Sequence, residues 1–167
     1  MPPIILIGPP GAGKTSVGKA LAKKLSLNFL DSDKVVEEKS GKSIPEIFIT
    51  DGEPAFREME RAAVIDLIEN QDGVIALGGG SVMDLEVSKR LLPMANVVFL
   101  DVSISNAAPR VGFNRDRPLL LGNPRQQWIA LMEKRRSTYE ALAKARVSTD
   151  NKKPVEVVEE IVKELAL

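Results

Sequence analysis

The chain has 167 residues, with 23 basic and 23 acidic side chains and therefore no net charge that would attract nucleic acid or an anionic membrane. It contains neither cysteine nor histidine, which excludes disulfides, thiolate or Ser-His catalysis, and zinc sites built from those residues. The length and the 44% of hydrophobic residues suit a single domain over residues 1–167. Without cysteine and histidine, any metal should be held by oxygen ligands, as Mg²⁺ is. The first apolar run ends at Gly8, too short for a signal peptide or a membrane span, so we expect a cytoplasmic protein. We also expect a monomer without nucleic-acid or membrane partners.

Short apolar runs alternate with helix-length segments along the chain. The apolar runs predict strands over residues 4–7, 29–30, 74–77, 97–100 and 146–149. Apolar residues at helical spacing predict helices over residues 15–25, 54–69, 85–92, 125–143 and 155–165. This alternation is typical of the α/β class, in which a parallel sheet lies between two helical layers and ligands bind at the carboxyl ends of its strands.

The first predicted strand leads into a glycine-rich turn, residues 8–15, with the sequence G-P-P-G-A-G-K-T. A turn of this pattern between a strand and a helix is a P-loop, whose backbone N–H groups hold polyphosphate at the start of the helix. Lys14 can reach the β- and γ-phosphates, and the Thr15 hydroxyl can bind Mg²⁺. The segment therefore predicts a nucleoside triphosphate site.

Two carboxylates, Asp31 and Asp33, follow the second predicted strand. In an extended chain they would share one side, close to the P-loop if the two strands are near neighbours. One interpretation is that Asp31 helps to hold Mg²⁺ and Asp33 receives the substrate hydroxyl. The alternative is structural, with Ser32 or Asp33 capping a helix over residues 34–39, and the two interpretations are compatible.

Three glycines, residues 78–80, end the third predicted strand, where they would let the backbone approach an anionic ligand. The basic residues of the helices favour a plainer interpretation. Arg57 suits a solvated face with a Glu53–Arg57 pair, and Arg135 with Arg136 suits a basic helix surface. Trp128 and Tyr139 are expected to be helix packing residues and not platforms on which a nucleotide base stacks.

The stretch 112–124 has glycine or proline at its edges and centre, and it carries Arg115 and Arg117, with Arg110 just before it. Helical segments flank this stretch, so we expect a mobile lid over phosphates. An arginine delivered by such a lid can neutralise the charge on a transferred phosphoryl group.

Taken together, these motifs resemble those of shikimate kinases of a bacterial, actinobacterial-like type along essentially the full chain. The resemblance depends on the P-loop, D-S-D at 31–33, G-K-S-I-P-E-I-F at 41–48, D-G-E-P-A-F-R-E-M-E at 51–60, G-G-G at 78–80, R-P-L-L at 117–120 and R-x-x-x-Y at 135–139. It implies a P-loop kinase fold similar to that of nucleoside monophosphate kinases, with a five-stranded parallel sheet of order 2-3-1-4-5. It also implies ATP-dependent phosphorylation of the 3-hydroxyl of shikimate, with a substrate-binding region near residues 31–61 and a lid near 112–124.

The resemblance assigns roles residue by residue. The catalytic residues would be Lys14, Asp33 and Arg117. The nucleotide would be bound by Gly11, Ala12, Gly13, Lys14, Thr15, Ser16, Arg110, Arg117 and Lys152. Shikimate would be bound by Asp33, Arg57, Gly78, Gly79, Gly80 and Arg135, and Mg²⁺ by Thr15 and Asp31.

Some alternatives stay open on the residues alone. Another small substrate, such as gluconate or a nucleoside monophosphate, would use the same kind of kinase. A nucleotide-dependent switch is a second alternative, although the chain has no N-K-x-D guanine signature. Arg115 lies beside Arg117, so the choice of the arginine that contacts the phosphates stays undecided. Arg136 lies beside Arg135, and the spacing to Tyr139 favours Arg135.

Overall fold

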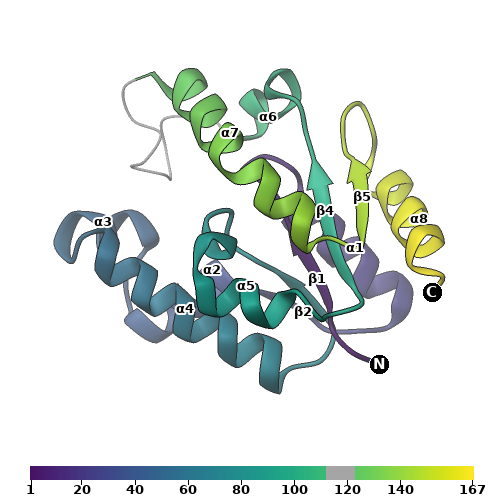
Figure 1. Ribbon diagram of the computed structural model, residues 1–167, viewed down its shortest axis with the longest axis horizontal. Helices are drawn as coiled ribbons and strands as arrows, with labels where there is room; N and C mark the ends of the chain where they lie inside the picture. The colour runs from purple at the N-terminus through teal and green to yellow at the C-terminus, as the bar shows by residue number, and fades with distance from the viewer. Residues whose placement is uncertain (112–122) are drawn as a thin grey trace.

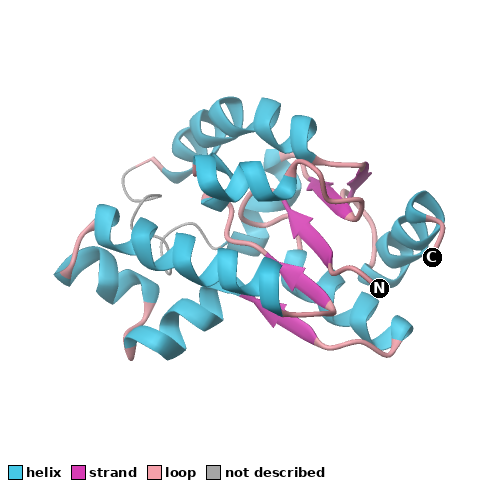
Figure 2. Ribbon diagram, turned by 60° about the horizontal axis from the view of Figure 1, so that its bottom comes forward, coloured by secondary structure: helices cyan, strands magenta, loops and turns pink. Residues whose placement is uncertain are grey.

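A parallel sheet of five strands forms the centre of this computed structural model, which describes residues 1–111 and 123–167 (Figures 1 and 2). The strands are β1 (Ile4–Ile7), β2 (Phe29–Asp31), β3 (Val74–Ala76), β4 (Val97–Asp101) and β5 (Ala145–Ser148). Every neighbouring pair is parallel, and the order is β2-β3-β1-β4-β5, which confirms the predicted topology.

Helices cover both faces of the sheet, so the three-layer arrangement is also confirmed (Figure 2). In chain order the helices are α1 (Lys14–Leu25), α2 (Ser32–Ser40), α3 (Ile44–Thr50), α4 (Glu53–Asn70), α5 (Leu85–Leu91), α6 (Ile104–Val111), α7 (Pro124–Leu142) and α8 (Pro154–Leu165), with a short 3-10 turn, η1 (Ser81–Met83). The sequence pattern did not predict α3 or α6. Helix α3 has only seven residues, and α6 has eight and contains Pro109, a residue type that disfavours a helix interior.

The main core lies between the sheet and its helices. Strand β1 is buried along its whole length, as expected for a continuous apolar run in the middle of a parallel sheet. Helices α1 and α8 pack against each other on one face, whereas α4, α5 and α7 cover the other (Figure 1). On that second face the Tyr139 ring stacks on Phe99 of β4, with 5.1 Å between ring centroids. Helix α7 is therefore anchored firmly to the sheet.

A second, smaller apolar cluster holds α2, α3 and α4 together. Its buried members are Val36, Ile44, Ile47, Phe56 and Ala63. The cluster gives these helices a packing centre of their own, largely within the predicted substrate-binding region near residues 31–61. It also fixes the orientation of α4, the helix that carries Arg57.

A buried carboxylate ends β4. The Asp101 side chain accepts two hydrogen bonds from the Arg136 guanidinium, at 3.0 and 3.2 Å, and another from Arg146 Nε at 3.1 Å. Burial alone would raise the pKa of Asp101, but hydrogen bonds and charge from Arg136, and then from Arg146, hold that pKa below its ordinary value. The three side chains join α7 and β5 to β4.

We expect Asp101→Asn to lower the free energy of unfolding by about 2 kcal/mol at pH 7, because charge-assisted hydrogen bonds are lost. Since the folded state lowers the pKa of Asp101, its contribution is complete above the ordinary aspartate pKa and is lost as the pH falls through the lowered value. Denaturant titrations at pH 7 and in acid measure this, and the difference from wild type should shrink in acid. Glu140→Gln, which changes an exposed partner of Arg136, is the control, and an Asp101→Asn variant as stable as wild type at pH 7 would contradict this assignment.

Candidate active site

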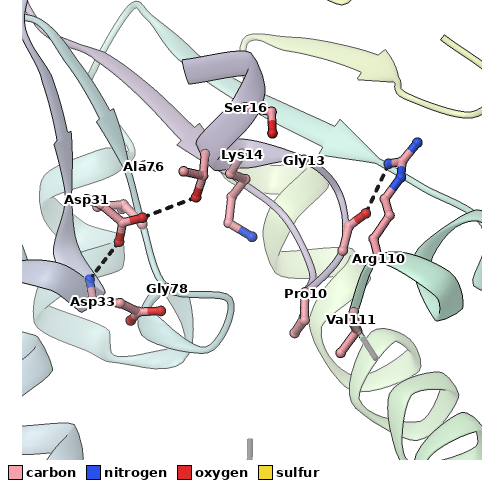
Figure 3. Close-up of a pocket in the computed structure, with 13 residues that line it drawn as sticks. Pro10, Gly13, Lys14, Ser16, Asp31, Asp33, Ala76, Gly78, Arg110 and Val111 are labelled. Carbon is pink, nitrogen blue, oxygen red and sulfur yellow. Dashed lines mark hydrogen bonds between the residues drawn. The ribbon is translucent and has the colours of Figure 1, made fainter. Parts of the chain in front are cut away.

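The loops that follow β1, β2 and β3 meet around a cavity of about 440 Å³ at the carboxyl edge of the sheet. Figure 3 shows Asp31 and Asp33 on one side of this cavity and Arg110 on the other, with Lys14 between them. Because β1 and β3 are neighbours, and β3 also pairs with β2, the three loops reach the same edge. The phosphate loop, the D-S-D segment and the first of the three glycines therefore lie around one cavity, as predicted.

The phosphate loop, residues 8–15, has the backbone shape that anion binding requires. Gly11 and Gly13 have φ values of 84° and 88°, in the left-handed region that favours glycine. Gly13 precedes α1 without a side-chain cap, so the first N–H groups of the helix are available to an anion at the cavity. The Lys14 ammonium lies over the loop, 2.7 Å from the Gly8 carbonyl oxygen and 3.0 Å from that of Pro9.

A hydroxyl and a carboxylate face each other across the floor of the cavity. The Thr15 hydroxyl donates to Asp31 Oδ2 at 3.3 Å (Figure 3). Burial raises the pKa of Asp31 above its ordinary value, and repulsion from the Asp33 carboxylate adds to the rise. No cluster of three or more acidic side chains that could hold a metal occurs within residues 1–111 and 123–167. A divalent cation at this position would therefore rely on these two side chains together with phosphate and water oxygens.

The prediction that Ser32 or Asp33 caps the helix after β2 is wrong, because Asp31 is the N-cap. Neither Ser32 nor Asp33 caps the helix, because α2 begins at Ser32 and its N-cap is Asp31, whose Oδ1 accepts from the Asp33 N–H at 2.9 Å. Asp31 therefore both caps α2 and faces Thr15, since its two oxygens point to different partners. The side chain of Asp33 lines the cavity instead.

The three glycines form a turn, residues 78–80, that side chains hold in place from three directions. The Gly78 N–H donates to Ser32 Oγ at 2.9 Å, and the Ser81 hydroxyl donates to the Gly78 carbonyl at 2.7 Å. The buried Tyr139 hydroxyl of α7 donates to the Gly79 carbonyl at 2.6 Å. With its carbonyls bound, this glycine turn has a defined orientation toward the cavity.

Charged side chains lie so close to Gly78 and Gly80 that a β-carbon on either residue would force one of them to shift. A β-carbon on Gly78 would lie 2.8 Å from both Asp33 Oδ1 and Glu60 Oε2. One on Gly80 would lie 2.6 Å from Arg57 Nη1 and 2.9 Å from Arg135 Nη2. Gly78 thus lies against two carboxylates and Gly80 against two guanidiniums, and Glu60 also contacts Arg57 directly.

The two guanidiniums differ in their partners. Arg57 binds Glu60 at 2.8 Å and Glu53 at 3.3 Å, so the solvated Glu53–Arg57 pair does form. Arg135 is only 6% exposed, yet among the described residues no side chain or carbonyl accepts a hydrogen bond from it. Both arginines line a second cavity of about 490 Å³, together with Gly80. The same cavity is also lined by Glu53, Glu60, Asp84 and Lys134. Because a buried cation is costly unless it is paired, the Arg135 guanidinium is suited to bind an anion there.

Arg136 has a different environment from its neighbour. It binds Asp101 away from the glycine turn, so only Arg135 of the adjacent pair reaches the second cavity. The expectation that both arginines lie on a solvated basic surface is therefore wrong for Arg135.

Beyond the phosphate loop, three residues were predicted to bind the nucleotide, and two of them, Arg110 and Lys152, lie within the described residues. Arg110 lines the first cavity, where its guanidinium donates to the Gly11 carbonyl at 3.0 Å and to Thr149 Oγ1 at 3.2 Å. Lys152 instead binds Glu160 at 2.7 Å and the Ser148 carbonyl at 3.0 Å. Arg115, Arg117 and most of the predicted lid lie outside the described residues.

Sequence reasoning assigned no role to Glu60 or to the polar ends of Trp128 and Tyr139. Glu60 follows Arg57 by one helical turn, a spacing that pairs side chains, but its burial becomes visible only in the fold. Trp128 and Tyr139 are buried in packing, as predicted, while the Trp128 N–H donates to the Pro10 carbonyl at 2.9 Å. No local sequence signal reports such a contact between residues far apart in the chain.

Comparisons with known proteins agree on one family. The shikimate kinase family model matches residues 10–166. A shikimate kinase of Rhodococcus jostii is 44% identical over 99% of this chain and 98% of its own, and one of Thermobifida fusca is 46% identical over 98% and 95%.

Solved structures agree with that match. A structure described as shikimate kinase from Acinetobacter baumannii in complex with shikimate has a TM-score of 0.95 at 34% identity, covering 99% of this chain and 93% of that one. A gluconokinase from Sinorhizobium meliloti has a TM-score of 0.62 at 21% identity, covering 99% and 92%, which shows a shared fold alone. Across residues 1–111 and 123–167, no helix combines the length and apolar character needed to cross a bilayer.

We expect Asp31→Asn to leave the free energy of unfolding at pH 7 unchanged or to raise it by up to about 1 kcal/mol. The amide keeps an oxygen for the α2 cap but removes a buried charge that faces Asp33. Asp31→Ala is the matched control, because it also removes the cap and should cost about 1 kcal/mol. Denaturant titration of both variants decides the matter, and an asparagine variant as unstable as the alanine variant would refute the charge argument.

Proposed function

The chain belongs to the shikimate kinase family and phosphorylates shikimate in aromatic amino acid biosynthesis, and we propose that it moves the γ-phosphoryl group of ATP to the 3-hydroxyl. The observation that carries the residue assignments is the buried Arg135 guanidinium, which forms no ion pair within the described part of the chain and lies beside Gly80 and Arg57. A carboxylate in that cavity would supply the missing charge. The family match does not favour gluconate or a switch function.

The phosphate loop would bind ATP. Backbone N–H groups of Gly11, Ala12, Gly13, Lys14, Thr15 and Ser16 are the proposed donors to the phosphates. The Lys14 ammonium, which donates to the Gly8 and Pro9 carbonyls of this loop, would contact the β- and γ-phosphates. Arg110 would lie along the nucleotide from the other side of the cavity, and Lys152 stays a prediction, since its ammonium pairs with Glu160.

The family's dependence on ATP implies a divalent metal, and we propose Mg²⁺ bound by Thr15 and Asp31. Their hydroxyl and carboxylate oxygens are the hard donors that Mg²⁺ prefers, and they lie 3.3 Å apart. A cation would also relieve the repulsion that raises the pKa of Asp31 beside Asp33. When bound, the metal neutralises charge on the phosphates.

Shikimate would occupy the space around the glycine turn. Two guanidiniums that approach Gly80 from different helices can bind one carboxylate from two directions, which fixes its position and orientation. Glu60 holds Arg57 in this position through the 2.8 Å pair. Gly78 and Gly79 would provide the backbone surface against which the ring lies.

Asp33 would receive the attacking hydroxyl. Its side chain lines the same cavity as Lys14, on the opposite side of the glycine turn from Arg135. With the carboxylate held by the arginines, a ring hydroxyl would reach Asp33 while it faces the phosphate loop. Orienting the hydroxyl in line with the γ-phosphate is the main requirement of phosphoryl transfer.

Other assignments stay predictions. Arg117, as the lid arginine on the phosphates, and the lid near 112–124 lie largely outside the described residues. We also propose that residues 1–167 form one domain, with substrate contacts near 31–61, that acts as a cytoplasmic monomer.

We expect purified protein with Mg²⁺ and ATP to release ADP with shikimate as acceptor, and not with gluconate or a nucleoside monophosphate. The physical reason is that a ring acid satisfies both guanidiniums while presenting a hydroxyl to Asp33. A coupled ADP-release assay over this acceptor panel measures it, with Lys14→Ala as the inactive control. Faster turnover of gluconate than of shikimate would reject the substrate assignment.

The neighbouring arginines offer a matched pair of variants. Arg135→Lys should weaken shikimate binding by about 30-fold, near the 2 kcal/mol of a charge-assisted hydrogen bond, because lysine lacks the planar fork. Arg136→Lys should leave shikimate binding within about twofold, since Arg136 contacts Asp101 instead. Calorimetric titration with shikimate and with ADP separates these effects. Equal losses of shikimate affinity in the two variants would remove Arg135 from the binding site.

A further inference from the structure

The first half of the phosphate loop is a tight turn whose central peptide can adopt two orientations. The Ala12 N–H donates to the Pro9 carbonyl at 3.2 Å and closes a four-residue turn. Proline at the second position and Gly11 with a φ of 84° at the third are the pattern of a type II turn. Type I and type II turns differ mainly by a flip of the central peptide, here the one that joins Pro10 to Gly11, and glycine permits both.

A side chain from α7 binds this same peptide. The Trp128 indole N–H donates to the Pro10 carbonyl at 2.9 Å, and the tryptophan is 4% exposed. The indole does not line the cavity of the phosphate loop, so it holds the carbonyl from the protein side. In a trans peptide the C=O and the next N–H point in opposite directions. The Gly11 N–H is therefore turned away from Trp128, toward the cavity that Pro10 and Gly11 line.

The orientation of this one N–H matters because of the loop's composition. Pro9 and Pro10 have no N–H, so Gly11 carries the first backbone donor after Gly8. A flipped peptide would present the Pro10 carbonyl oxygen to the cavity instead, and a carbonyl repels phosphate. Replacing a donor by an acceptor at this point would weaken any polyphosphate contact.

We propose that Trp128 is a positioning residue for the nucleotide: its N–H holds the Pro10–Gly11 peptide in the orientation that aims Gly11 N–H at a bound phosphate. This inference rests on the proposed function of the loop as the ATP site. Trp128 touches neither substrate and acts through the backbone. Its effect is therefore specific to nucleotide affinity.

A second contact on the same helix provides an internal comparison. Trp128, Arg135 and Tyr139 are all on the buried stripe of α7. Tyr139 donates to the Gly79 carbonyl, on the side of the ring acid, just as Trp128 donates to the Pro10 carbonyl on the side of the nucleotide. Each contact is one hydrogen bond from α7 to a loop carbonyl, so the two can be removed separately.

The test compares Trp128→Phe with Tyr139→Phe, each of which keeps an aromatic ring and removes one donor. Calorimetry measures the affinity of each variant for ADP with Mg²⁺ and for shikimate. We expect Trp128→Phe to weaken ADP binding about five- to tenfold, the effect of one hydrogen bond, with shikimate binding within about twofold. Tyr139→Phe should show the reverse.

Two results would overturn the proposal. One is unchanged ADP affinity in Trp128→Phe, and the other is an equal loss for both ligands in both variants, which would indicate general loosening of α7. Wild-type protein is titrated first. If it failed to bind ADP, the proposed function would be refuted together with this inference, whereas the two results above refute the inference alone.

Two further measurements apply if the phenylalanine variant folds poorly. Benzothienylalanine at position 128 replaces the indole N–H with sulfur at nearly the same shape, and it should show the same selective loss of ADP affinity. Trp128 is also the only tryptophan in the sequence, so its fluorescence can be assigned without ambiguity. That emission should change when ADP binds and stay constant when shikimate alone binds, and the opposite pattern would contradict the proposal.

Discussion

The site depends on a glycine turn that charged side chains approach closely. The Asp33 and Glu60 carboxylates lie against Gly78, and the Arg57 and Arg135 guanidiniums lie against Gly80, with Glu60 also paired to Arg57. A β-carbon on Gly78 or Gly80 would displace these charged groups, so bare backbone allows them to gather at the turn. Hydrogen bonds from neighbouring elements keep this turn in one orientation.

Two features of the site are costly to the ligand-free protein. Asp31 and Asp33 repel each other strongly enough to contribute to the raised pKa of Asp31, and the buried Arg135 guanidinium forms no ion pair with any residue described. Bound cation and bound carboxylate would each remove one of these imbalances. On this proposal, binding energy would come from charges that the ligand-free fold compensates poorly, a common compromise between stability and function.

Much of the architecture was predictable because it follows from local patterns. The apolar runs and the phosphate loop are as the local patterns indicate, whereas the sheet order was implied by the resemblance to shikimate kinases and not by any local pattern. The arginines were harder, because the expected Glu53–Arg57 pair does form, and only tertiary packing reveals that Arg57 also meets Glu60 at the glycine turn. Likewise Trp128 was expected to pack, and it does, but its bond to Pro10 joins residues that only the fold brings together.

The central claim is that Arg57 and Arg135 bind the substrate's carboxylate beside the glycine turn while Asp33 faces the hydroxyl to be phosphorylated. The most direct measurement is a crystal structure of this protein with shikimate and ADP bound. The account predicts a carboxylate in hydrogen-bond contact with both guanidiniums and a ring hydroxyl on the Asp33 side chain, next to the phosphate loop. A ring acid whose carboxylate lies away from both arginines would contradict it.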